Sequence, residues 1–340
     1  HSHFQIAKAA IEMGKHVYLE KPMVQTIPQA RELQELAAAK GVATQMGNQG
    51  HTKGLIYKLK EWIDAGVIGK VHQVDIWTNR PPVYWEQGQQ SLPGKQEVPK
   101  ALDWELWLAG VADPEDYPYH EDYCHMVWRA WYAFGTGALG DMGCHQMDGT
   151  FYALELGNPT RVTAETSGQS EVAFPVSSKV TYEFPKRGEH PPMTLNWYDG
   201  KRKPDKPKEM KDHKMGVTGA LIYGEDATIY VPDTYYRTFR IVPEAKMKKL
   251  AKEVSQLPKT IERPKPRDHF GNFVSACKGE IDQASSDFSY AAPLTELVLL
   301  GAIAQRRPGK SLAFDSKSGR FINDSKANQI LKNPVPEPTG

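Results

Sequence analysis

Apolar residues recur at helical spacing in three segments and form short continuous runs in three others, and the two kinds alternate over the first 80 residues. The helical segments are 1–14, 27–41 and 53–66, and the apolar runs that follow them are 16–20, 42–48 and 70–80. Short apolar strands separated by helices are typical of a parallel α/β sheet. Because such a sheet has a strand before each crossover helix, we expect earlier βα units of this domain to be missing from the sequence.

The pattern changes after residue 80. Residues 81–129 form a connection rich in proline, glutamine and tryptophan, and loops of this length are usually functional. Beyond residue 160, apolar and polar residues alternate, which predicts a multistranded antiparallel sheet, and two helices are predicted near the end. The predicted strands are 161–167, 177–185, 191–200, 220–232 and 236–243, and the helices are 267–279 and 292–309.

The predicted fold class is therefore α/β, with a partial Rossmann-like parallel sheet followed by an α+β domain that has a large, open, mostly antiparallel sheet. We assign residues 1–80 to the C-terminal part of a Rossmann dinucleotide-binding domain. Residues 81–315 form the substrate-binding and oligomerisation domain, and residues 316–340 form a C-terminal tail.

Composition excludes several classes of partner. The 340 residues include 42 basic and 41 acidic side chains, so a net charge of +1 gives no reason to expect nucleic-acid binding. No apolar run approaches the roughly 18–20 residues that span a bilayer, and we expect no membrane partner. The three cysteines have no C-x-x-C spacing, so neither a disulfide framework nor a zinc site is expected.

Residues 134–148, FGTGALGDMGCHQMD, contain a G-x-G-x-x-G at Gly135, Gly137 and Gly140. A dinucleotide-binding turn needs an apolar strand before it, but the preceding residues are aromatic and include Arg129. The parallel α/β alternation also lies before this stretch rather than after it. We therefore interpret the glycines as the entry to a helix and not as a phosphate loop.

The polar side chains of the same stretch are candidates for chemistry. If a helix begins near Asp141, then Asp141, His145 and Asp148 stand at i, i+4 and i+7 on one face. A carboxylate near a histidine favours a general base at neutral pH. Taken singly, Asp141 also fits a helix-capping residue and His145 a buried core histidine. Metal ligation by the nearby cysteines and histidines is not favoured, because their spacing matches no zinc signature.

Three motifs together resemble the Gfo/Idh/MocA family of oxidoreductases, named for glucose–fructose oxidoreductase and inositol dehydrogenase. They are EKP at residues 20–22, GNQGH at 47–51 and GDMGCHQMD at 140–148, and they occur in the family's order and spacing. IDAGVIGKV, LDWELWLAG and APLTELVLLGAIAQR extend the resemblance over essentially the full length. The aromatic insertion and GDMGCH look most like a subgroup common in Bacteroidetes and Planctomycetes.

The resemblance implies an N-terminal Rossmann domain that binds NAD or NADP, and a second domain whose open sheet makes homo-oligomers, either dimers or tetramers. It assigns Lys21 to the nicotinamide and the reacting hydroxyl, His145 to acid–base chemistry and Asp141 to the substrate. The Lys21–Pro22 peptide bond is expected to be cis. The other implied residues are Glu20, Pro22, Asn48 and Gln49 for the cofactor and Arg80, Trp128, Arg129 and Asp148 for the substrate.

The function implied is hydride transfer from a hydroxyl of a sugar, glycoside or cyclitol to the nicotinamide of NAD or NADP. One alternative is an NAD-dependent glycoside hydrolase that works by transient oxidation and elimination. The other is a non-catalytic sugar-binding protein or an inactive fragment. The sequence leaves the compartment open between cytoplasm and periplasm.

Overall fold

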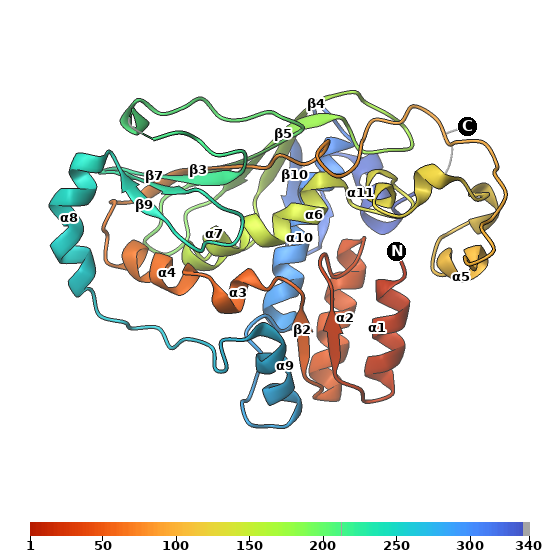
Figure 1. Ribbon diagram of the computed structural model, residues 1–340, viewed down its shortest axis with the longest axis horizontal. Helices are drawn as coiled ribbons and strands as arrows, with labels where there is room; N and C mark the ends of the chain where they lie inside the picture. Colours follow the sequence, from red (N-terminus) through yellow and green to blue (C-terminus); the bar gives the residue numbers. More distant parts are fainter. Residues whose placement is uncertain (212, 336–340) are drawn as a thin grey trace.

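The computed structural model describes residues 1–211 and 213–335. These residues form two sheets, a two-stranded parallel sheet near the N-terminus and a nine-stranded, mostly antiparallel sheet (Figure 1). This arrangement confirms the predicted fold class.

The small sheet has the predicted helix–strand alternation. Helix α1 (His3–Glu12) leads to β1 (Val17–Leu19), and α2 (Ile27–Lys40) leads to β2 (Thr44–Met46), which pairs with β1 in parallel. The hydroxyl of Thr26 accepts a hydrogen bond from the Gln29 backbone N–H and so caps the start of α2. Gly41 ends α2 with a φ of 62°, a left-handed conformation that favours glycine.

The third predicted strand of the parallel sheet lies elsewhere. After α3 (Gly50–Lys53) and α4 (Ile56–Asp64), β3 (Val71–Trp77) enters the large sheet between β6 (Met193–Asp199) and β7 (Gly219–Gly224). It pairs with β6 in parallel and with β7 antiparallel. The prediction of one parallel sheet through residue 80 was wrong here, because the last four residues of β3 are buried in succession, and such a run reads the same in either sheet.

The large sheet has the strand order β11-β10-β4-β5-β6-β3-β7-β8-β9. Its other strands are β4 (Arg161–Ser167), β5 (Ser177–Phe184), β8 (Thr228–Val231), β9 (Arg240–Val242), β10 (Leu312–Asp315) and β11 (Arg320–Phe321). The five predicted segments are confirmed as the strands β4 to β9, except that 220–232, predicted as one strand, is divided into β7 and β8. The β10–β11 hairpin was not predicted, and it extends the sheet past residue 316, where we had placed the start of a tail.

The remaining helices were only partly expected. Helix α8 (Glu244–Gln256) and α11 (Ser325–Lys332) were not predicted, whereas α9 (His269–Cys277) and α10 (Phe288–Gln305) lie where the sequence placed them. Short helical turns occur in the irregular segments. They are α5 (Trp104–Trp107), η1 (Pro114–Asp116), η2 (Glu121–Tyr123), η3 (Val127–Ala130) and η4 (Lys208–Met210).

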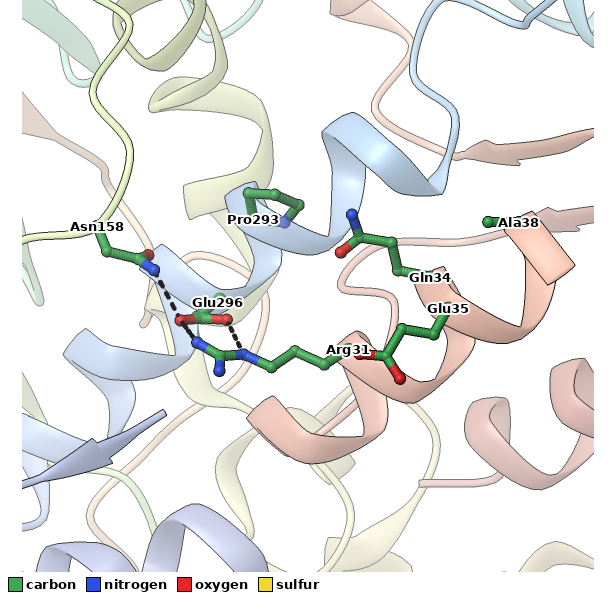
Figure 2. A pocket seen from close by; sticks show the side chains of 7 residues that line it. All are labelled: Arg31, Gln34, Glu35, Ala38, Asn158, Pro293 and Glu296. Atoms are coloured by element: carbon green, nitrogen blue, oxygen red, sulfur yellow. Dashed lines mark hydrogen bonds and ion pairs between the residues drawn. The ribbon is translucent and has the colours of Figure 1, made fainter. Parts of the chain in front are cut away.

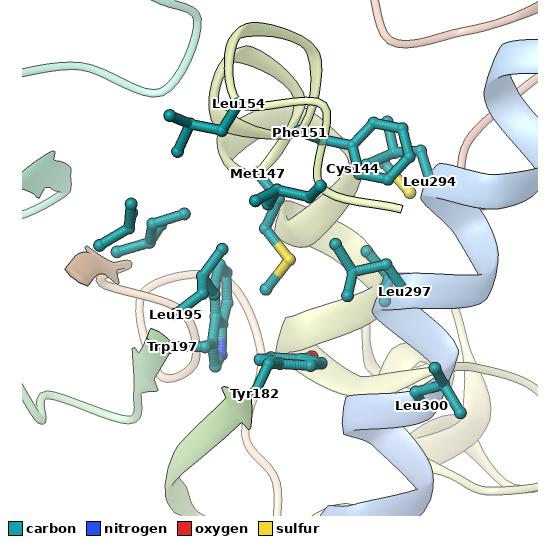
Figure 3. Close-up of a cluster of buried hydrophobic side chains, with 14 of the residues drawn as sticks. Cys144, Met147, Phe151, Leu154, Tyr182, Leu195, Trp197, Leu294, Leu297 and Leu300 are labelled. Carbon is teal, nitrogen blue, oxygen red and sulfur yellow. The ribbon is translucent and has the colours of Figure 1, made fainter. Parts of the chain in front are cut away.

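Helix α10 joins the two sheets. It contacts α2 and β2 on the side of the small sheet, and α6 (Gly137–Gln146), β4 and β5 on the side of the large one. Figure 3 shows Leu294, Leu297 and Leu300 of α10 in a buried cluster with Tyr182 and with Met147, which precedes α7 (Asp148–Ala153). By length and composition α10 could cross a membrane, but 83% of it is buried inside the protein, which accounts for its apolar sequence.

An ion pair also fastens α2 to α10. Arg31 donates from Nε and Nη2 to the two carboxylate oxygens of Glu296, at 2.8 and 2.6 Å, and Asn158 Nδ2 donates to the same carboxylate at 2.9 Å. These residues line an open surface pocket between the two helices (Figure 2). The charged groups satisfy one another, so we interpret this pocket as a structural clamp.

Most aromatic residues of the 81–135 segment pack against each other. Trp85, Trp104, Tyr123, Trp131 and Phe134 are buried in one cluster, and the rings of Trp104 and Tyr123 lie 6.0 Å apart. These five side chains therefore form a core of their own rather than a surface that could stack on a sugar ring.

A glycine of α10 provides a test of this architecture. A Cβ at Gly301 would overlap the hydroxyl of Tyr182 on β5 and the side chain of Leu139 on α6. Overpacking usually costs about 1–3 kcal/mol, more than the roughly 0.5–1 kcal/mol that alanine gains over glycine in a helix. We expect Gly301→Ala to lower the free energy of unfolding in urea titrations. Gly94→Ala is the control, because nothing lies within 4 Å of a Cβ there, and equal stability of the two variants would contradict this packing.

Candidate functional site

Lys21 lies directly beyond the carboxyl end of β1, where parallel α/β sheets bind ligands. Its Nζ donates to Asp141 Oδ1 at 2.9 Å and also to the Asp141 backbone carbonyl oxygen. The Lys21–Pro22 peptide bond is cis, as expected. The structure thus brings together two of the three predicted catalytic residues, which are 120 positions apart in the sequence.

Arg129 approaches the same carboxylate from the aromatic segment. Its Nε donates to Asp141 Oδ1 at 3.0 Å and its Nη1 donates to the Met126 carbonyl oxygen at 3.3 Å. The guanidinium lies 4.4 Å from the ring centre of Trp128. Arg129 was predicted to contact substrate; in the structure it holds Asp141 and stacks on Trp128.

The glycines of residues 134–148 serve this packing. A Cβ at Gly135 would lie 2.6 Å from the Arg129 backbone, and Gly137 has a φ of 66° and lies against Phe174. Gly140 packs against Thr136. Each glycine therefore permits a close approach within this segment, which supports the interpretation that they are not a phosphate loop.

The environment of Asp141 favours the carboxylate form. Its side chain is only 12% exposed, and burial alone would raise its pKa. Lys21 and Arg129 outweigh burial and hold the pKa of Asp141 below its ordinary value. Two cations thus share one oxygen of a buried carboxylate.

His145 lies one helical turn beyond Asp141 on α6 and is 7% exposed. Burial lowers the pKa of His145 to about 3, and the Lys21 charge acts in the same direction. Its Nδ1 has no hydrogen-bond partner among the described residues, whereas the Asp141 carboxylate bonds to Lys21 and Arg129. His145 and Asp141 therefore lie on the same helix without a hydrogen bond between His145 Nδ1 and the carboxylate. The imidazole is neutral and has a nitrogen that can accept a proton.

Tyr235 adjoins this histidine and was not predicted. Its ring centre lies 5.1 Å from that of His145, with the planes at 71°. The same residue lies against Gly50, where a Cβ would come within 3.3 Å of the Tyr235 ring. Tyr235 follows β8 in an irregular stretch without periodicity, so no pattern in the sequence indicated that it would contact α3 and α6.

Asn48 follows β2 and is fully buried, with neither Oδ1 nor Nδ2 hydrogen-bonded to a described residue. Leaving two buried polar atoms unpaired is costly unless a ligand or water pairs them. Beside it, a Cβ at Gly47 would overlap the Glu20 carboxylate, and Gln49 Nε2 donates to the Tyr18 hydroxyl at 3.3 Å. An amide that offers both a donor and an acceptor fits the carboxamide of a nicotinamide, so the residues present are compatible with the predicted cofactor.

Asp148 lies apart from Asp141 and His145. The helix that was predicted to carry all three begins at Gly137 and is interrupted at Met147, and Asp148 starts α7. One carboxylate oxygen of Asp148 accepts from His51 Nδ1 at 2.9 Å and from the Tyr290 hydroxyl at 2.6 Å. His51 of α3 and Tyr290 of α10 are therefore the partners of Asp148, and the spacing within residues 141–148 could not indicate either of them.

The two remaining residues predicted to contact substrate, Trp128 and Arg80, have different surroundings. Trp128 and Lys21 line the same small cavity, of about 50 Å³. Arg80 follows β3, donates to Asn79 Oδ1 at 2.8 Å and lies 3.8 Å from the ring centre of Tyr84. Within residues 1–211 and 213–335, no group of three or more potential metal-ligating side chains comes together.

Two family models match this chain. Residues 1–48 match the NAD-binding Rossmann fold of the Gfo/Idh/MocA oxidoreductase family, and residues 53–189 match the family's C-terminal alpha/beta domain. The chain belongs to this family. The Rossmann match covers β1, β2, Lys21 and Asn48, so these residues are part of an NAD-binding domain.

Curated relatives match shorter segments. The uncharacterized oxidoreductase YdgJ of Escherichia coli is 34% identical over 116 residues, which cover 32% of this chain and 34% of YdgJ. The scyllo-inositol 2-dehydrogenase (NADP+) IolW of Bacillus subtilis is 25% identical over 171 residues, which cover 50% of this chain and 36% of IolW. The alignment spans about a third of each of these two relatives.

Solved structures share the fold at low sequence identity. The WlbA dehydrogenase from Chromobactrium violaceum, in complex with NADH and UDP-GlcNAcA, gives a TM-score of 0.57 at 17% identity and covers 92% of this chain and 75% of that one. An inositol dehydrogenase homolog from Azotobacter vinelandii, complexed with NADH and myo-inositol, gives 0.53 at 14% identity, covering 92% and 75%. These likenesses establish the fold.

The burial of His145 has a measurable consequence for stability. Its folded-state pKa of about 3 lies below the ordinary value near 6.5, so between these pH values the unfolded chain binds more protons and stability falls as pH falls. We expect His145→Gln to flatten this decline in urea titrations from pH 7 to pH 4. Part of the decline remains, because burial also lowers the pKa of His269, to about 4. Exposed His72→Gln is the control, and an unchanged slope in His145→Gln would contradict the buried neutral state.

Proposed function

We propose that this protein is an NAD(P)-dependent oxidoreductase that removes hydride from a CH–OH group of a sugar, glycoside or cyclitol. The observation that carries this proposal is the meeting of Lys21, Asp141 and Arg129 near a buried, neutral His145, at the carboxyl end of β1. The strand belongs to the segment that matches the NAD-binding Rossmann fold.

Each side chain of the site has a separate role in the proposed reaction. Neutral His145 accepts the proton of the reacting hydroxyl, and the Lys21 ammonium stabilises the negative charge that develops on the oxygen. Asp141, fixed by Lys21 and Arg129, accepts a hydrogen bond from the substrate. A bound nicotinamide would supply the hydride acceptor, and Asn48, with its unpaired amide, would hold the carboxamide.

The substrate class is supported by two kinds of observation. Trp128 presents an incompletely buried ring beside Lys21, and aromatic faces suit the apolar faces of sugar rings. Two similar proteins, IolW and the Azotobacter homolog, are named as inositol dehydrogenases or homologs of them. We further propose a homo-oligomer, a dimer or tetramer, formed through the large sheet.

Replacing the proposed base tests the function. In the complete protein, His145→Ala should lower turnover by about 10²–10⁴-fold, because it removes the proton acceptor, while NAD affinity stays nearly unchanged. The measurements are NADH formation with a panel of glycosides and inositols, and NAD titration by fluorescence.

The matched control is His72→Ala, an exposed histidine on β3, which should keep parental turnover. Near-parental turnover of His145→Ala would refute the assignment. Aglycone release without accumulation of NADH would instead indicate the glycoside hydrolase. A complete protein that does not bind NAD would support a non-catalytic sugar-binding protein.

A further inference from the structure

A second cluster of buried polar side chains lies around Asp148. The Asp148 carboxylate is 2% exposed and accepts hydrogen bonds on one oxygen from His51 of α3 and from Tyr290 of α10. Three separate helices thus supply its members. None of them is used by the hydride-transfer chemistry proposed above.

The hydrogen bond to Asp148 selects the tautomer of neutral His51. A carboxylate oxygen only accepts, so neutral His51 carries its proton on Nδ1 and leaves Nε2 as an acceptor. His51 is 2% exposed and its Nε2 has no partner among the described residues, yet the residue lines a pocket of about 570 Å³. An acceptor without a protein partner among the described residues, on a residue that lines a pocket of this size, is suited to a hydrogen-bond donor from a ligand.

Aromatic rings form the wall around this acceptor. The ring centres of Tyr57, Tyr152 and Tyr290 lie 5.9, 5.8 and 4.4 Å from that of His51. Tyr57 and Tyr152 make no side-chain hydrogen bond with a described residue, so their hydroxyls can bond to a ligand in the pocket. The wall therefore offers flat apolar faces together with hydroxyl groups.

The charges around the pocket disfavour an anion. Arg263 donates from both Nη atoms to Glu61, at 2.8 and 2.7 Å, and Lys265 pairs with Glu262 at 3.3 Å. Asp282 and Glu280 also line the pocket. With its cations paired to carboxylates and further acids at its edge, the pocket suits a neutral ligand that donates hydrogen bonds.

We propose that the pocket around His51 is a second binding site for a neutral polyhydroxylated ligand, such as a sugar or cyclitol ring, with His51 Nε2 accepting one of its hydroxyls. Helix α3 separates this site from the hydride-transfer site. Gly50 of α3 lies against Tyr235, which contacts His145, whereas the next residue, His51, lines the pocket. The proposal does not depend on the proposed function, because binding here requires neither cofactor nor turnover.

Histidine NMR on the full chain tests this site directly. In protein labelled with ¹⁵N-histidine, methyl β-D-glucopyranoside or myo-inositol should shift the Nε2 resonance of His51 and leave its Nδ1–H tautomer in place. Methyl β-D-glucuronide, which has a carboxylate in place of the hydroxymethyl group, should bind at least about tenfold more weakly because of the acidic edge.

Variants separate the pocket from the hydride-transfer site. His51→Gln should abolish binding of the glucoside. If His51→Gln does not fold, Tyr152→Phe is the alternative variant, because it removes one hydroxyl and keeps the ring. Tyr152→Phe should preserve the fold and weaken binding of the glucoside. Lys21→Met should leave the His51 shift intact. The proposal is overturned if neither neutral probe shifts His51, if the glucuronide binds as tightly as the glucoside, or if Lys21→Met removes the shift.

Discussion

The neutralisation of one buried carboxylate organises this protein. Asp141 is ionised although nearly enclosed, and a buried charge without partners would cost several kcal/mol. Lys21 from the small parallel sheet and Arg129 from the aromatic segment both bond to it, so two distant parts of the chain must converge on α6. Burial, together with the Lys21 charge that the convergence brings close, lowers the pKa of His145 and keeps the imidazole neutral.

The pairing of Arg129 with Asp141 also explains the glycine-rich stretch. Arg129 can reach Asp141 only if the chain folds back closely between them, and Gly135 allows that approach because a side chain there would strike the Arg129 backbone. A motif that resembles a phosphate loop in spacing thus serves the packing of a charged cluster. The aromatic residues before it fill a core of their own, with Trp128 left at its edge.

Much of this could be predicted from the sequence, and the exceptions have physical causes. The strands of the antiparallel sheet follow from alternation, and Lys21 and Asp141 follow from the family motifs. The placement of β3 did not, because a run of consecutive buried residues such as 74–77 does not indicate which sheet the strand joins. Nor did the partners of Asp148, because His51 and Tyr290 come from other helices and spacing within one segment cannot indicate them. His51 and Tyr235 contact their partners only through tertiary folding.

Helix α10 has a consequence for the order in which the molecule can be built. It begins at Phe288, late in the chain, yet it covers β4 and β5 on one side and α2 on the other. During synthesis, every earlier element leaves the ribosome before the helix that covers its apolar face. A nascent chain that stops short of Gln305 therefore keeps those faces open to water, and such surfaces promote aggregation unless chaperones shield them. Helix α10 thus completes the apolar cores of both sheets late in synthesis.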